Sequence, residues 1–146
     1  MLSRLIKDYK EVKVVNGDCQ KKTNFKSNFF DRVIAIHILE HLPDLPKALH
    51  EINRVIKKSG IFQVVIPCEG SLAYSIARKI SAERIFKKRY GMDYDWFIKR
   101  EHINSPFEIF TELDKFFETN IIKFFPFNSI PLEFCNLCIG INLKKK

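Results

Sequence analysis

A strand, a helix and a second strand follow one another between Phe29 and Pro67, and this order limits the fold more than any other part of the sequence. Residues 33–36 and 61–66 are short runs rich in β-branched side chains, and both are nearly continuous in apolar character. Strands that are covered on both faces have this composition. A crossover helix between two such strands is the unit of a parallel sheet, so the sequence predicts an α/β fold.

The segment between the two runs carries the signals of a helix. Asp44 can cap its amino terminus, and Pro46 fits the first turn, where no backbone donor is needed. We expect Gly60, after two lysines and a serine, to end the helix. Apolar side chains recur at helical spacing, at Leu45, Ala48, Leu49, Ile52, Val55 and Ile56.

Several short motifs in and around this unit follow a characteristic order. They are Gly17-Asp18 after an earlier apolar run, Phe30-Asp31, the turn His37-Ile38-Leu39-Glu40-His41, and the helix end Arg54-Val55-Ile56-Lys57. In order and spacing they resemble the central motifs of class I S-adenosylmethionine-dependent methyltransferases. The resemblance implies a Rossmann-like, mostly parallel sheet with an antiparallel carboxyl-terminal hairpin. The five expected strands are residues 12–16, 32–36, 61–66, 121–127 and 137–143.

The glycine-rich loop with which that family holds its cofactor is not found in this sequence. The glycines are too far apart for a Gly-x-Gly turn, at Gly17, Gly60, Gly70, Gly91 and Gly140. We therefore expect residues 1–146 to form a single, truncated methyltransferase domain without the first βαβ unit. Whether this reflects a fragment, a misassigned start or a reduced homologue stays open. The first strand should then lie beside residues 32–36 or stand detached.

The resemblance also implies which residues meet S-adenosylmethionine. Asp18 would accept a hydrogen bond from the adenine amino group, and the backbone amide of Cys19 would meet the ring. The backbone near Ile36 and His37 would lie beside the methionine part. His41 is the candidate catalytic residue, because histidine exchanges a proton near neutral pH. Two alternatives stay open. Asp18 could only form a turn, and His37 and His41 could only cap or pack against the turn that contains them.

The net charge of +8 is concentrated in one stretch of the chain. Apolar residues at Leu72, Ile76 and Ile80 predict an amphipathic helix over residues 71–88. Its basic side is either a solvated face or a surface for an anionic acceptor or membrane. No nucleic-acid-binding signature accompanies the charge, so no specific nucleic-acid partner is expected. The basic residues are Arg78, Lys79, Arg84, Lys87, Lys88, Arg89, Lys99 and Arg100.

The acceptor side is expected next to this helix. Residues 90–97 are rich in aromatic side chains without clean periodicity, which fits a lid or a loop that places its aromatics in the core. In the lid interpretation, Tyr94 and Trp96 cover a small or lipid-linked acceptor, and Lys87 and Lys88 attract it if it is anionic.

A last helix is predicted by a capping box at Ser105 and Glu108, with Pro106 in the first turn. Its apolar face should consist of Phe107, Phe110, Leu113, Phe116 and Phe117.

Two patterns that could indicate a metal are weak, and no metal is expected. Residues 37–41 read His-x-x-Glu-His, the inverted zinc-protease motif, but that chemistry needs both histidines on one helix. Here they leave a β run, and Pro43 follows closely. Cys135 and Cys138 lie in a strand-like run, where residues three apart point to opposite faces.

The predicted function is methyl transfer from S-adenosylmethionine to an oxygen, nitrogen or carbon atom. The alternative from another class is a non-catalytic remnant or interaction module without a cofactor pocket. The four cysteines are expected to be reduced thiols in a cytoplasmic protein. The apolar run 2–6 is too short for a signal or a span, so no transmembrane segment is expected. Peripheral contact with a membrane stays open.

Overall fold

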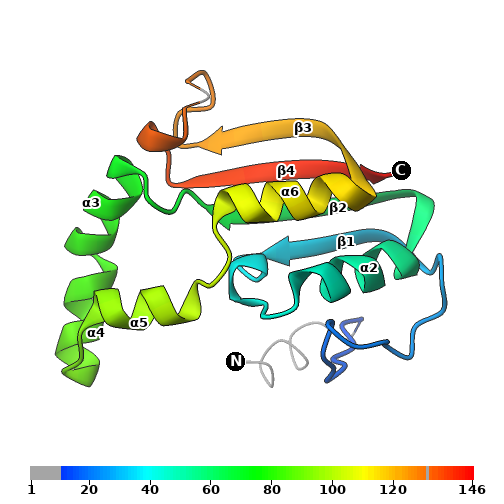
Figure 1. The fold of residues 1–146 in the computed structure, drawn as a ribbon, viewed down its shortest axis with the longest axis horizontal. Coiled ribbons are helices and arrows are strands. Elements are labelled where there is room, and N and C mark those ends of the chain that lie inside the picture. Colours follow the sequence, from blue (N-terminus) through cyan, green and yellow to red (C-terminus); the bar gives the residue numbers. More distant parts are fainter. Residues whose placement is uncertain (1–10, 131) are drawn as a thin grey trace.

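The structure is a computed structural model that describes residues 11–130 and 132–146. Residues 1–10, which contain the apolar run 2–6, lie outside the described part of the chain. The described strands form one sheet in the order β1-β2-β4-β3 (Figure 1). The predicted α/β class is therefore confirmed.

The sheet combines one parallel and two antiparallel pairings. β1 (Phe30–Ile36) and β2 (Ile56–Pro67) are parallel. β4 (Cys138–Lys145) runs antiparallel to β2 and to the edge strand β3 (Phe117–Phe125). The antiparallel carboxyl-terminal pair follows the expectation, although β3 begins four residues before the predicted strand 121–127.

The first expected strand is absent from the structure. Residues 12–16 have no regular secondary structure, and Val12, Val14 and Val15 are 43%, 44% and 65% exposed. A strand requires a neighbour that satisfies its backbone hydrogen bonds, and none of the described strands pairs with this segment. The prediction of a strand at 12–16, beside residues 32–36 or detached, is wrong.

The crossover helix is α2 (Leu45–Val55), and its start follows the prediction. An Asp44 carboxylate oxygen accepts a hydrogen bond from the Lys47 backbone N–H at 3.2 Å. The end does not follow it, because α2 stops at Val55 instead of near Gly60. Ile56 is fully buried and pairs with Phe30, so its side chain is held in the sheet.

The residues after Ile56 form an irregular stretch of β2. Phe30 pairs with Ile56 and Arg32 pairs with Ile61, so several extra residues of β2 lie opposite a single residue of β1. Such a bulge brings backbone atoms close together. Gly60 lies at this close approach, where a side chain would meet the carbonyl oxygens of Lys57 and Asp31.

The core lies between the sheet and two helices on one of its faces (Figure 1). α2 and α6 (Pro106–Phe116) cover the face onto which β2 directs Phe62, Val64 and Ile66. These three side chains are at most 1% exposed.

No described helix covers the opposite face of the sheet. Ile34 and Ile36 of β1 point to that face and are each 57% exposed. With Gln63, Lys123 and other side chains they line a shallow hollow of about 330 Å³. The expectation that β1 is covered on both faces is therefore wrong for the described residues.

The capping box that starts α6 is confirmed, since Ser105 and Glu108 exchange both hydrogen bonds. The predicted apolar face is only partly right. Ile109 and Leu113 are buried at 0% and 2% exposure, whereas Phe107 is 80% exposed. Two residues along a helix turn the side chain by about 200°, so Phe107 and Ile109 lie on opposite sides.

A helical unit lies beyond the carboxyl end of β2, at the left of Figure 1. It consists of α3 (Leu72–Ile80), α4 (Ala82–Tyr90) and α5 (Tyr94–Glu101). The single helix predicted over residues 71–88 is broken at Ser81, whose hydroxyl donates to the Ala77 carbonyl at 2.7 Å. A serine that bonds back to the preceding turn competes with the backbone and bends a helix.

Candidate active site at the carboxyl end of the first strand

The chain leaves β1 through a turn with a strained residue. His37 has φ +49°, the left-handed region that non-glycine residues rarely occupy. Its backbone N–H donates to the Val65 carbonyl at 2.9 Å, and its Nδ1 lies 3.3 Å from a carboxylate oxygen of Glu40. Strain of this kind costs about 1–3 kcal/mol and concentrates at functional sites. The carboxyl end of a parallel strand is also where open α/β sheets bind ligands.

The turn after His37 is a one-turn 3-10 helix, Leu39–His41, which carries the buried Glu40. The Glu40 carbonyl oxygen accepts hydrogen bonds from the backbone N–H groups of Ile103 and Asn104, at 2.9 and 3.2 Å. The Asn104 side-chain amide donates to the carbonyls of Leu39 and Leu42, both at 2.8 Å. These bonds fasten the segment after α5 to the turn after β1.

This docking brings two histidines together that are 61 positions apart. The rings of His41 and His102 make an edge-to-face contact with their centres 4.6 Å apart. His41 Nδ1 lies 2.9 Å from the Glu101 carbonyl oxygen, and His102 Nδ1 lies 2.6 Å from a Glu69 carboxylate oxygen. Sequence reasoning singled out His41 but missed His102 and Glu69, because neither belongs to a local motif.

The inverted zinc-protease alternative does not fit this geometry. Its two histidines must lie on one face of a helix, but His37 directly follows β1 and His41 closes a 3-10 turn of three residues. That alternative is therefore wrong.

Asp18 and Cys19 line a hollow of about 560 Å³ formed by residues 15–19 and 21–25. An Asp18 carboxylate oxygen accepts hydrogen bonds from the backbone N–H and the side-chain amide of Gln20, at 2.9 and 3.2 Å. The bond from that backbone N–H is the main reason that the pKa of Asp18 is lowered. Asp18 thus has the turn role, and its contact with adenine stays a prediction. Ile36 does not line this hollow but the one of about 330 Å³ on the uncovered face of the sheet.

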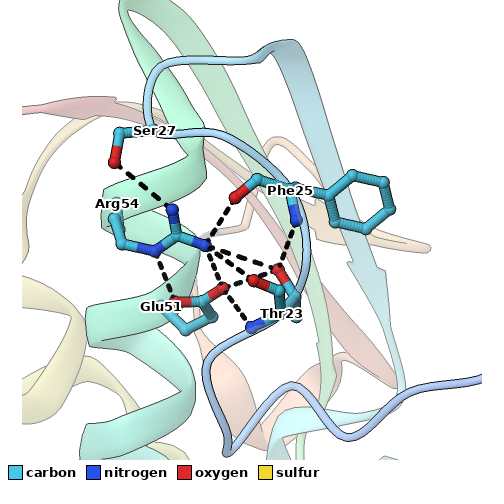
Figure 2. A network of polar contacts seen from close by, with 5 residues as sticks. All are labelled: Thr23, Phe25, Ser27, Glu51 and Arg54. Carbon is cyan, nitrogen blue, oxygen red and sulfur yellow. Dashed lines mark hydrogen bonds and ion pairs between the residues drawn. The ribbon is translucent and has the colours of Figure 1, made fainter.

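A polar network holds the segment that carries this hollow onto α2 (Figure 2). One Glu51 carboxylate oxygen accepts from the N–H and hydroxyl of Thr23, at 2.8 and 2.6 Å. Arg54 donates to both oxygens of Glu51, to the Phe25 carbonyl at 2.8 Å and to the Ser27 hydroxyl at 3.3 Å. The Glu51 and Arg54 side chains are 7% and 20% exposed.

The four predicted acceptor-side residues lie on α4 and α5. Tyr94 is half-buried against Phe86, with ring centres 5.2 Å apart, and burial raises the pKa of Tyr94. Trp96 is 55% exposed, and Lys87 and Lys88 are exposed on α4. Residues 94–97 are helical, so the expectation of an irregular loop is wrong for them. The structure groups these residues in one helical unit, and their contact with an acceptor stays a prediction.

The cysteines carry free thiols. Cys135 lies in a short 3-10 helix, Glu133–Cys135, and Cys138 begins β4, so the two do not share one strand as expected. Burial raises the pKa of the Cys68 thiol to about 11, which makes this thiol unreactive near neutral pH. None of the described helices is long and apolar enough to cross a membrane.

Comparison with known proteins agrees with this architecture. Residues 1–64 match the family model of the methyltransferase domain. Over 52 residues the chain is 44% identical to the sterol 4-C-methyltransferase of Caenorhabditis elegans, a match that covers 36% of this chain and 15% of that protein.

Solved structures match the chain over nearly its whole length. A protein of Pyrococcus horikoshii gives a TM-score of 0.68 at 15% identity, over 99% of this chain and 65% of that one. A SAM-dependent methyltransferase of Aquifex aeolicus gives 0.64 at 15% identity, over 99% and 61%. The resemblance to the class I methyltransferases is confirmed. The chain spans only part of the length of the relatives that it matches.

Proposed function

We propose that this chain forms the acceptor side and part of the cofactor side of an S-adenosylmethionine-dependent methyltransferase. The observation that carries the proposal is the strained turn at His37, at the ligand edge of a sheet with the methyltransferase order. The match of residues 1–64 to the methyltransferase domain supports it, because that stretch contains this turn.

In this proposal the cofactor meets two segments of the chain. Asp18 and Cys19 receive the adenine, which is consistent with their position in the 560 Å³ hollow. The backbone at Ile36 and His37 receives the methionine part. His41 orients the acceptor or takes its proton. Methyl transfer mainly requires the nucleophile and the methyl group to be held in line, so a strong base is not essential.

We infer a small or lipid-linked acceptor, received by the helical unit α3–α5. The name of the C. elegans relative, a sterol methyltransferase, supports an apolar acceptor. Trp96 is 55% exposed, and the Arg100 guanidinium lies over one face of its ring, 5.5 Å from the ring centre. Lys87 and Lys88 favour an acceptor with an anionic group, although Lys87 already pairs with Glu83 at 2.7 Å. The free thiols are consistent with a cytoplasmic location.

A second candidate is an interaction module without catalysis. The observation that favours it is the uncovered face of the sheet, where Ile34 and Ile36 are more than half exposed. Contiguous apolar surface of this kind marks binding to another macromolecule. The two candidates differ in whether the chain recognises the cofactor.

Calorimetric titration of S-adenosylhomocysteine into residues 1–146 separates the two candidates. We expect saturable binding weaker than about 1 µM, because the sequence has no glycine-rich turn for the polar half of the cofactor, and hence negligible turnover. Asp18→Ala should weaken the binding about tenfold further, the value of one hydrogen bond of about 1.4 kcal/mol.

Asp31→Ala is the matched control, since Asp31 is an exposed aspartate that pairs with Lys57 at the opposite end of β1. It should leave the affinity unchanged. If no heat of binding appears, or if both aspartate variants act equally, the cofactor role of Asp18 is refuted and the interaction module is favoured.

A further inference from the structure

We propose that Glu40, His41 and His102 form a binding site for a divalent transition metal ion, with Zn²⁺ as the ion that fits best. The ligand atoms of these three side chains all lie within 4.8 Å of one another. This site was not expected from the sequence, because His102 reaches it through the docking of the segment after α5 onto the turn after β1. It is independent of the proposed methyl transfer.

The buried carboxylate of Glu40 indicates a missing partner. Glu40 is 1% exposed, and its Oε2 atom is buried without a hydrogen-bond partner among residues 11–130 and 132–146. Its other oxygen, Oε1, has only the 3.3 Å contact with His37 in this part of the chain. A buried charge without partners is costly, so such groups are normally paired or bound to a metal. A cation held between Glu40 and the two histidines would supply the partner.

Contacts at Nδ1 leave Nε2 of both histidines available as a ligand. A carbonyl oxygen can only accept a hydrogen bond, so His41 Nδ1, 2.9 Å from the Glu101 carbonyl, carries the proton in the neutral ring. His102 Nδ1 lies 2.6 Å from Glu69 Oε1, at ion-pair distance but not in hydrogen-bond alignment. Metal-binding histidines commonly have a carbonyl or carboxylate at the second ring nitrogen, which fixes the tautomer.

The ligand set selects the class of ion. Two imidazoles and one carboxylate suit Zn²⁺ and related transition metals, whereas Mg²⁺ prefers oxygen ligands alone. In a tetrahedral zinc site the ligand atoms would be about 3.4 Å apart, so the distances of up to 4.8 Å have to shorten by up to about 1.4 Å on binding. Three protein ligands leave one position open, as in catalytic zinc sites.

The ion would join two parts of the chain that are far apart in the sequence. Glu40 and His41 belong to the turn at the ligand edge of the sheet, and His102 directly follows α5. Metal binding would therefore hold the helical unit against the end of β1. A ligand that binds only the folded chain also raises its stability by mass action.

Cobalt titration of the full 146-residue chain tests the site, after a chelator has removed bound metal. We expect visible absorption bands of four- or five-coordinate Co²⁺ that Zn²⁺ abolishes and Mg²⁺ does not. His102→Gln and Glu40→Gln should weaken Co²⁺ binding at least 100-fold. Glu69→Gln should weaken it by about 10- to 100-fold, the usual effect of losing a partner of a metal-binding histidine.

His50→Gln is the matched control, because His50 is an exposed histidine on α2 outside the cluster. It should bind Co²⁺ like the unchanged chain. Zn²⁺ should raise the thermal unfolding midpoint of the unchanged chain and of His50→Gln, but not that of His102→Gln. Circular dichroism without metal identifies any variant that fails to fold. If His102→Gln or Glu40→Gln fails to fold, the Co²⁺ affinity of the other of these two variants tests the site.

Three results would overturn the proposal. They are the absence of visible bands, bands that persist in His102→Gln, and a thiolate-to-cobalt charge-transfer band that would place the ion on the free cysteines.

Discussion

Gly60→Val is expected to lower the free energy of unfolding by about 3 kcal/mol, because the bulge of β2 has no room for a side chain. A Cβ atom at Gly60 would lie 2.7 Å from Ile56 Cγ1, 3.0 Å from the Lys57 carbonyl oxygen and 3.1 Å from the Asp31 carbonyl oxygen. Ile56 is fully buried, and the two oxygens belong to the backbone. The two oxygens cannot move without a shift of the backbone of β1 and β2.

Urea unfolding followed by circular dichroism measures this loss. Gly140→Val is the matched control on β4, where the nearest atom to an added Cβ is the Lys123 carbonyl oxygen at an ordinary 3.8 Å. The control should change the free energy of unfolding by less than about 1 kcal/mol. Equal effects of the two substitutions would contradict the close approach of backbone atoms at Gly60.

Glu51→Gln is expected to lower the free energy of unfolding by about 3 kcal/mol at neutral pH. Glutamine removes the charge that pairs with Arg54 and leaves donors of Arg54 and Thr23 without a charged acceptor. The segment that carries Asp18 and Cys19 should loosen together with the network. Glu118→Gln, at an exposed position on β3, removes the same charge and should have an effect below about 0.5 kcal/mol.

The effect of Glu51→Gln should depend on pH. Hydrogen bonds from Arg54, followed by those from Thr23, lower the pKa of Glu51 from 4.5 to about 2. Because the folded chain has the lower pKa, the stabilisation is fully present above pH 4.5 and is lost as the pH falls toward 2. The difference corresponds to about 3 kcal/mol at 1.36 kcal/mol per pKa unit. The gap between the urea midpoints of the two proteins should therefore narrow from pH 6 to pH 3. A constant gap would contradict the network.

The sequence predicted correctly those features for which the local preference of the residues and their tertiary packing favour the same structure. The cap at Asp44 and the capping box at Ser105 and Glu108 are confirmed, because cap residues act within one turn. The end of α2 was missed, because burial of Ile56 against the sheet outweighs the helix-ending signal of Gly60. The strand at residues 12–16 was wrongly predicted, because a strand exists only if another strand pairs with it, and pairing is not a local property.

The candidate site was accessible from the sequence only in part. His37, Glu40 and His41 lie within five residues, so a short motif could draw attention to them. His102 and Glu69 come from other parts of the chain, and the docking of Asn104 onto Leu39 and Leu42 brings His102 to this turn. No local pattern encodes that docking.

In the proposed function, the turn at Asp18 and the end of β1 together form the cofactor half-site. Amide chemical shifts of labelled residues 1–146, recorded during titration with millimolar S-adenosylhomocysteine, test it most directly. We expect saturable shifts at Asp18, Cys19, Ile36 and His37, with α6 unaffected. Shifts that are absent from these four residues, or that appear only on α3–α5, would contradict the claim.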